Sequence, residues 1–185
     1  MNKIIVISGA RGIGDLIYQL PLLRSLYLTY KTKLTLISNE VNKSKEVYKY
    51  EDFYDEIINF DNTRYSIFKT FVKIKSFLKL LNKHESDLLI LTSNATRLML
   101  PVYFSNAKKK IIFGTKNFIL IKDKTNSHLT NCEKLISYTN SLNLKIKNNS
   151  FFLNFPEIED IDKSIINNKI FISIDSHHDQ NNWSI

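Results

Sequence analysis

Three glycines and one carboxylate stand within seven residues near the start of the chain, in the order Gly9, Gly12, Gly14 and Asp15. Glycine lets the backbone turn sharply and lets another group approach it closely. If a helix begins at this point, its free N–H groups and the positive end of its dipole favour an anion in the loop. The spacing therefore predicts a tight turn that can hold an anionic group.

The residues on both sides of the turn predict the elements that position it. Residues 4–7 read Ile-Ile-Val-Ile, a short apolar run rich in β-branched side chains that is typical of a buried strand. After the turn, apolar residues recur at spacings of four, three and four, which place them on one face of a helix. These residues are Leu16, Leu20, Leu23 and Tyr27. Strand, turn and helix form the first half of a βαβ unit.

Two general interpretations of this turn can be compared. In one, it is a tight connection in any α/β domain, and Asp15 only stabilises the first turn of a helix. In the other, it belongs to a nucleotide-dependent oxidoreductase, but the spacing is G-x-x-G-x-G rather than the G-x-G-x-x-G of dinucleotide-binding enzymes. The next strand also ends Ser38-Asn39, without the acid that such enzymes place there. We therefore disfavour the oxidoreductase.

The same alternation of strands and helices continues along the chain. Apolar runs predict strands at residues 33–37, 56–60, 87–91 and 109–113, and helical spacing predicts helices at 40–50, 65–82 and 97–104. In the helix 65–82 the expected buried stripe is Ile67, Phe71, Ile74, Leu78 and Leu81. This order predicts an α/β fold, a Rossmann-like parallel sheet with helices on both faces.

Small polar residues follow the predicted strand 87–91, from Thr92 to Thr96. The carboxyl end of a parallel strand is where α/β sheets bind ligands. The same side chains are good N-caps for the helix that follows, and we favour the capping role.

Composition narrows the class of protein. The chain has 185 residues and a net charge of +8, but only four of its cations are arginines, so the charge reflects a lysine-rich composition and does not predict a nucleic-acid partner. The single cysteine, Cys132, gives no disulfide, as expected in a reducing cytoplasm. For the lysine-rich helix 65–82 we favour packing on the sheet with a solvated outer face, and the pattern is also compatible with peripheral contact at the inner membrane surface.

The opening stretch resembles glycosyltransferase family 9, the ADP-heptose heptosyltransferases of lipopolysaccharide assembly. The resemblance rests on Gly12-Ile13-Gly14-Asp15 and on the Leu-Pro-Leu-Leu-Arg-Ser-Leu run that begins at Leu20. It continues at residues 110–114, in a helix over 128–144, and at residues 169–183, where a strand and a polar loop lead to Trp183.

Such a resemblance implies a two-domain enzyme of the GT-B type. We expect residues 1–155 to form the N-terminal acceptor-side domain, and residues 156–185 to contain a linker and the first strand of a truncated donor-binding domain. On this interpretation the chain is a monomeric, cytoplasmic fragment that would not transfer sugar alone. The alternative is a non-catalytic α/β domain with a degenerate site.

The resemblance also implies roles for individual residues. Asp15 would be the catalytic base of an inverting transfer, Gly12, Ile13 and Gly14 would bind substrate, and Ser176 and His177 would contact the phosphates of the donor. The implied donor is ADP-heptose and the implied acceptor a lipopolysaccharide-core or related glycan, with no metal and no further cofactor. Asn181 departs from the pattern, because the family usually carries a basic residue there.

Overall fold

The computed structural model describes residues 1–10, 12–39, 43–61, 67–93 and 95–113, and a few residues between 139 and 154. All of them fall in one compact unit, Met1–Asn154. The predicted domain boundary at residue 155, the strand near 169–174 and the helix start at 128 lie outside the described residues, so these stay predictions.

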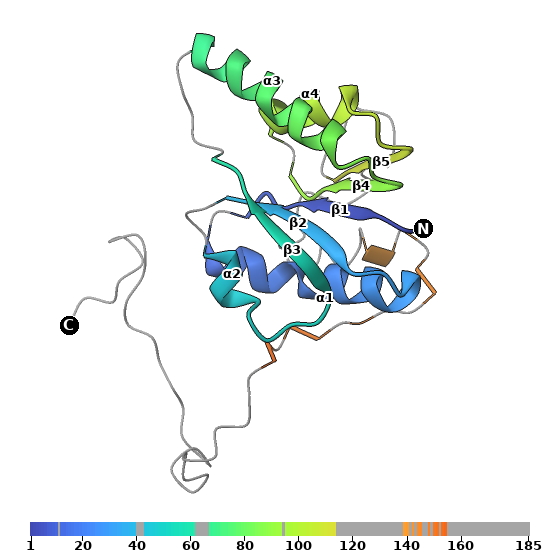
Figure 1. Cartoon of the computed structure of the whole chain (residues 1–185). Helices are drawn as coiled ribbons and strands as arrows, with labels where there is room; N and C mark the ends of the chain where they lie inside the picture. Colours follow the sequence, from blue (N-terminus) through green and yellow to red (C-terminus); the bar gives the residue numbers. More distant parts are fainter. Residues whose placement is uncertain are drawn as a thin grey trace, which may run out of the picture. The chain divides into compact units, whose positions relative to one another are not determined.

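The core of the domain is a five-stranded sheet in which every neighbouring pair is parallel, in the order β3-β2-β1-β4-β5. This arrangement confirms the predicted α/β fold (Figure 1). The strands lie within two residues of their predicted bounds. They are β1 (Ile4–Ile7), β2 (Leu34–Ser38), β3 (Tyr54–Asn59), β4 (Leu88–Leu91) and β5 (Lys109–Ile112).

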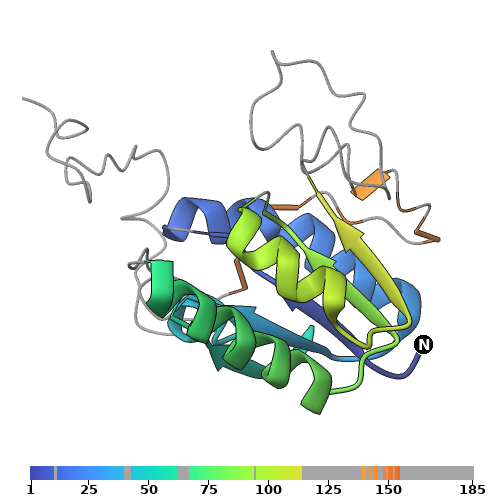
Figure 2. The same cartoon turned by 90° about the horizontal axis from the view of Figure 1, so that it is seen from above.

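Helices cover both faces of this sheet. Helices α1 (Ile13–Tyr30) and α2 (Ser44–Val47) lie on one face, and α3 (Ile67–Lys83) and α4 (Thr96–Phe104) lie on the other (Figures 1 and 2). Because side chains alternate along a strand, Ile4 and Val6 of β1 pack in the cluster that includes α1. Ile5 and Ile7 pack in the cluster that includes α3 and α4. Strand β1 is buried on both faces, which explains its uninterrupted apolar sequence.

Two helix predictions differ from the structure. Helix α2 is one turn long, Ser44–Val47, rather than spanning residues 40–50. In α3 the fully buried residues are Phe77 and Leu81, whereas Phe71, predicted to be buried, is exposed. Phe71 belongs to the first turns of α3, and Figure 1 shows that this end of the helix rises away from the sheet, where helical spacing alone does not lead to burial. No described helix is long and apolar enough to cross a membrane.

Asp87 ties the amino ends of three elements together. Its carboxylate accepts hydrogen bonds from the backbone N–H of Asn2 at 2.7 Å and of Lys3 at 3.3 Å, and it pairs with the amine of Lys108 at 2.7 Å. The hydrogen bond from Lys108 and the backbone donors lower the pKa of Asp87 to about 2. The charged carboxylate therefore holds the start of β1 against β4 and the segment that leads into β5.

The contacts of the Asp87 carboxylate predict that the stability of the domain depends on pH. Because the folded state lowers the pKa of Asp87 from 3.8 to about 2, its contribution is fully present above about pH 4 and is lost as the pH falls towards 2. Urea unfolding of the wild type and of Asp87→Asn should differ at pH 6 and converge by pH 2. A constant difference across that range would contradict this role of the carboxylate.

Candidate functional site

The loops that follow β1 and β4 meet at the carboxyl edge of the sheet. The chain runs outward from β1 to β3 and then returns to β4 on the other side of β1. Thr92, the first residue after β4, accepts a hydrogen bond from the N–H of Gly9 at 3.1 Å and donates its hydroxyl to the carbonyl of Ile7 at 3.2 Å. In open α/β sheets, ligands bind at this switch in strand order.

Gly9 is required by this contact between the loops. A Cβ built at residue 9 would lie 2.2 Å from the Cβ and 2.8 Å from the Oγ of Ser93, closer than side-chain atoms can approach. Any larger residue at position 9 would force the ends of β1 and β4 apart. Gly9 therefore has a structural role that the sequence pattern did not separate from the roles of the other glycines.

Contacts with the described residues do not require glycine at positions 12 and 14. Apart from the adjoining backbone, no atom of the described residues lies within 4 Å of a Cβ built at either position. Gly12 is the extended N-cap of α1, with φ of −135°, which any residue can adopt. Glycine is less favourable than alanine within a helix, yet Gly14 lies in the first turn of α1. The backbone at these two glycines therefore faces open space that another molecule can occupy.

Three of the predicted substrate-binding residues and the predicted base share this turn. Gly12, Ile13, Gly14 and Asp15 form the start of α1, where the apolar side chain of Ile13 is exposed and Asp15 is half-buried. The structure thus brings a carboxylate, two bare backbone positions and a helix N-terminus together at the carboxyl edge. Such a turn can offer N–H donors to an anionic or hydroxyl-rich ligand and a carboxylate to accept a proton.

Tyr48 holds this turn in place by a hydrogen bond to the backbone of α1. Its buried hydroxyl donates to the carbonyl of Leu16 at 2.7 Å, one residue beyond Asp15. Burial, and then the charge of Glu51, raise the pKa of Tyr48, so the hydroxyl keeps the proton that it donates. No sequence pattern predicts this contact, because residues 16 and 48 come together only when α2 packs against α1.

A nearly buried ion pair joins Arg24, further along α1, to Glu51. The Nε and Nη2 atoms of Arg24 donate to the two carboxylate oxygens of Glu51 at 3.1 and 2.7 Å. The backbone N–H of Asn154 also donates to Glu51, at 2.9 Å, and the N–H of Asn148 donates to the hydroxyl of Ser25 at 2.8 Å. Asn148 is thereby held against α1, and Asn154 against the ion pair.

The capping role predicted for Thr92–Thr96 is wrong where the structure describes it. The N-cap of α4 is Ala95, and no side chain caps it. Thr92 bridges to the β1 loop instead, and the Oγ of Ser93 accepts a hydrogen bond from the N–H of Ala95 in the turn before the helix. These hydroxyls shape the carboxyl edge rather than the end of α4.

Other candidate sites contribute little. Ser176, His177 and Asn181 lie outside the described residues, so their predicted roles are not tested. Among the described residues no group of three His, Cys, Asp or Glu side chains could hold a metal ion.

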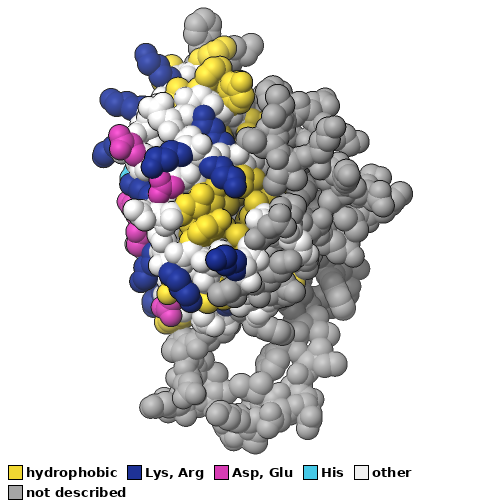
Figure 3. Space-filling view, turned by 90° about the vertical axis from the view of Figure 1, so that its right-hand side faces the viewer, with side chains coloured by type: hydrophobic (Ala, Val, Ile, Leu, Met, Phe, Trp, Pro, Cys, Tyr) yellow, Lys and Arg dark blue, Asp and Glu magenta, His cyan; other side chains and the backbone are white. Residues whose placement is uncertain are grey.

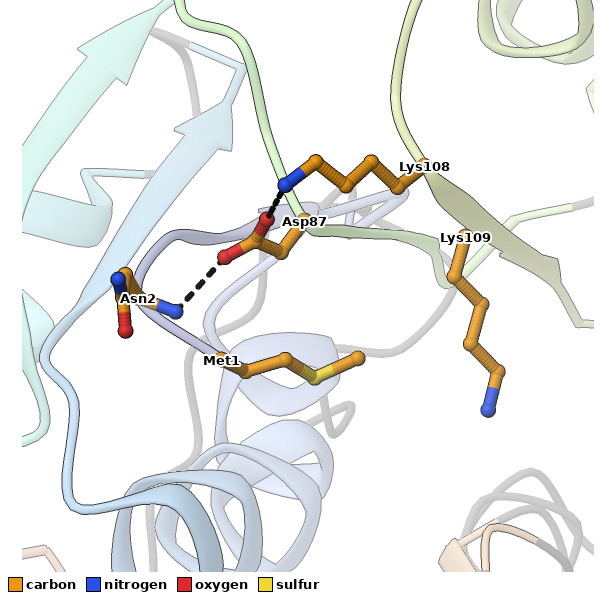
Figure 4. Close-up of a pocket in the computed structure, with 5 residues that line it drawn as sticks. All are labelled: Met1, Asn2, Asp87, Lys108 and Lys109. Carbon is orange, nitrogen blue, oxygen red and sulfur yellow. Dashed lines mark hydrogen bonds and ion pairs between the residues drawn. The ribbon is translucent and has the colours of Figure 1, made fainter.

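A shallow cavity of about 410 Å³ lies at the opposite, amino edge of the sheet, around Asp87 and its partners (Figure 4). It is lined by Met1, Asn2, Asp87, Lys108 and Lys109.

The contrast between the glycines gives a direct test. Gly9→Ala should lower the free energy of unfolding by about 1–3 kcal/mol, because the new methyl group overlaps Ser93. Adding Ser93→Gly should recover much of that loss, because it removes the two nearest atoms.

Gly14→Ala is the matched control for the glycine test. It should fold at least as stably as the wild type, with a gain of up to about 0.5–1 kcal/mol, since the methyl group meets open space. Urea unfolding followed by circular dichroism measures all four chains. Equal destabilisation by the two alanine substitutions would contradict the distinction between them.

Comparison with known structures identifies relatives of the fold. A glycosyltransferase of family 9 from Veillonella parvula DSM 2008 is similar with a TM-score of 0.61 and 19% identity, over 80% of this chain and 42% of that one. The Escherichia coli heptosyltransferase WaaC is similar in its structure with ADP (TM-score 0.54, 12% identity). It is also similar in its structure with ADP-2-deoxy-2-fluoro heptose (TM-score 0.55, 13% identity). Each WaaC match covers 75% of this chain and 47% of that one.

These matches define how far the likeness extends. The chain spans less than half the length of the structures it matches. No family model matches the sequence, and no curated protein matches it. At such low identity the likeness is one of fold. The described domain therefore has the α/β fold found in family 9 and heptosyltransferase structures, as the resemblance of its opening motif predicted.

Proposed function

We propose that this chain is the acceptor-side part of a glycosyltransferase that moves a sugar from a nucleotide-sugar to a glycan. The donor we propose is ADP-heptose, and the acceptor a lipopolysaccharide-core or related glycan. The observation that carries the proposal is the first turn of α1. There Asp15 stands beside two glycines whose Cβ positions are open, at the carboxyl edge of the sheet.

In the proposed reaction one bond forms as another breaks. A hydroxyl oxygen of the acceptor attacks the anomeric carbon of the donor sugar, and the bond from that carbon to the diphosphate oxygen breaks. The bonding electrons leave with ADP, and the hydroxyl proton passes to the carboxylate of Asp15. Attack on the face opposite to the leaving group inverts the configuration at the anomeric carbon.

The residues of the turn have distinct parts in this proposal. Gly12 and Gly14 leave room for the acceptor to approach the backbone, and exposed Ile13 offers an apolar edge to a sugar ring. Donor binding is assigned to Ser176 and His177, on the basis of the sequence resemblance alone. Because positive charge must balance the leaving diphosphate, Asn181 is the position at which we expect donor affinity to depart from that of the family.

Asp15→Asn separates catalysis from stability. A first-turn acid contributes about 0.3–1 kcal/mol through the helix dipole, so the variant should fold with nearly unchanged stability. Asparagine cannot accept the proton, so sugar transfer should slow by at least about 100-fold. Transfer from ADP-heptose is measured with the natural protein that contains this chain, together with donor binding, which should be unchanged.

Asp55→Asn is the matched control, because Asp55 is an exposed acid of β3 outside the turn. It should turn over at the wild-type rate. If Asp15→Asn also retains near-normal turnover, Asp15 is a structural residue and the catalytic proposal is wrong.

A further inference from the structure

Tyr18 carries an exposed aromatic ring beside the first turn of α1. It follows Gly14 at i+4 and Asp15 at i+3, so the three residues share one surface of the helix. Side chains of a helix lean back over the turn that precedes them, which directs the ring of Tyr18 towards that first turn. Tyr18 is 41% exposed, and none of its atoms lies within 4 Å of a Cβ built at Gly14. The ring therefore borders the open space over the turn.

Phe151 supports the ring of Tyr18. The two rings meet edge to face, with centroids 6.4 Å apart and planes at 87°. Phe151 is held by its neighbours along the chain, because Nη1 of Arg24 donates to the carbonyl of Ser150 at 3.4 Å and Leu153 packs against the core cluster that includes α1. Tyr18 is thus oriented by a fixed neighbour while a large part of its ring stays open to a ligand.

The other exposed aromatic side chains of the described residues belong to other elements. Tyr50 follows α2, and the amine of Lys49 lies 5.2 Å from the centroid of its ring. The remaining ones belong to α3 and α4, on the opposite face of the sheet, and are Phe71, Tyr103 and Phe104.

The amino edge of the sheet offers no comparable surface in the part of the chain that the structure describes. None of the residues that line the cavity around Asp87 is aromatic. Figure 3 looks at the side of the domain on which the chain begins and shows basic and acidic side chains close together there. A sugar that needs an aromatic partner therefore finds one at the carboxyl edge, next to Asp15.

We propose that Tyr18 selects the acceptor by stacking its ring on the C–H face of a pyranose unit. The face of an aromatic ring is electron-rich, and the C–H bonds on the apolar face of a sugar carry partial positive charge, so the two surfaces attract each other. A sugar stacked on Tyr18 keeps its hydroxyls at its rim, where one of them can reach Asp15 on the same surface of α1. Tyr18 takes no part in proton transfer and acts on specificity. The inference rests on the sugar transfer proposed above.

Binding of a heptose-containing core oligosaccharide to the 185-residue chain tests the role of the ring. Tyr18→Leu keeps an apolar side chain but removes the aromatic face, and should weaken binding by roughly 3- to 10-fold, the usual contribution of one aromatic contact. Tyr18→Phe keeps the face and loses only the hydroxyl, so its affinity should stay within about twofold of the wild type. Titrations of the 15N-labelled chains give the three dissociation constants, and circular dichroism confirms that each variant is folded.

Tyr103→Leu is the matched control. Tyr103 is also an exposed tyrosine that meets a phenylalanine edge to face, with its centroid 5.2 Å from that of Phe104, but it lies on α4. This variant should bind the oligosaccharide as the wild type does.

Kinetics of the natural protein that contains this chain separate the two proposals. Tyr18→Leu should raise the KM for the acceptor by the same factor as the dissociation constant and leave kcat within about twofold, whereas Asp15→Asn should lower kcat. The role of Tyr18 is overturned if the wild-type chain does not bind the oligosaccharide, or if Tyr18→Leu binds it normally. It is also overturned if Tyr18→Phe or Tyr103→Leu loses as much affinity as Tyr18→Leu. Each of these outcomes leaves the role of Asp15 to be decided by the transfer rate of Asp15→Asn.

Discussion

The space between Gly9 and Ser93 sets the geometry on which the domain depends. A single Cβ at residue 9 would fall 2.2 Å from the side chain of Ser93, so the loops that follow β1 and β4 can approach this closely only because residue 9 has none. The pairing of β1 with β4 is the point at which the strand order changes direction. With Gly9 in place, the hydroxyl of Thr92 can bridge the two loops, and the first turn of α1 begins just beyond them.

This constraint divides three neighbouring glycines into two kinds. Gly9 is needed by the chain itself, whereas Gly12 and Gly14 face space left open by the described residues, and Gly14, inside the first turn of α1, also costs helix stability. Proteins accept such costs most often where a ligand must come close to the backbone. Tyr48 supports the same turn through Leu16. The first turn of α1 is thus held by a buried hydrogen bond, which suits a surface that must orient a reactant.

Local sequence patterns predicted the sheet because each strand is a short apolar run between turn residues, and βαβ chirality leaves few ways to join them. Contacts between distant residues were harder to foresee. The burial of Phe77 instead of Phe71 depends on how far α3 extends past the sheet, which helical spacing cannot tell. The bridging role of Thr92 depends on a strand 85 residues away. The location of Asp15 in a first helical turn was predicted, while its catalytic role stays a proposal.

The central claim is that the open surface over the first turn of α1 receives the acceptor. Amide chemical shifts of the 15N-labelled chain, measured during titration with a heptose-containing core oligosaccharide, test it most directly. We predict that the largest shifts fall on the amides of Gly12, Ile13, Gly14 and Asp15, with smaller ones at Ser93. Shifts confined to the cavity around Asp87 and Lys108, or unmoved amides from Gly12 to Asp15 at saturation, would contradict the account.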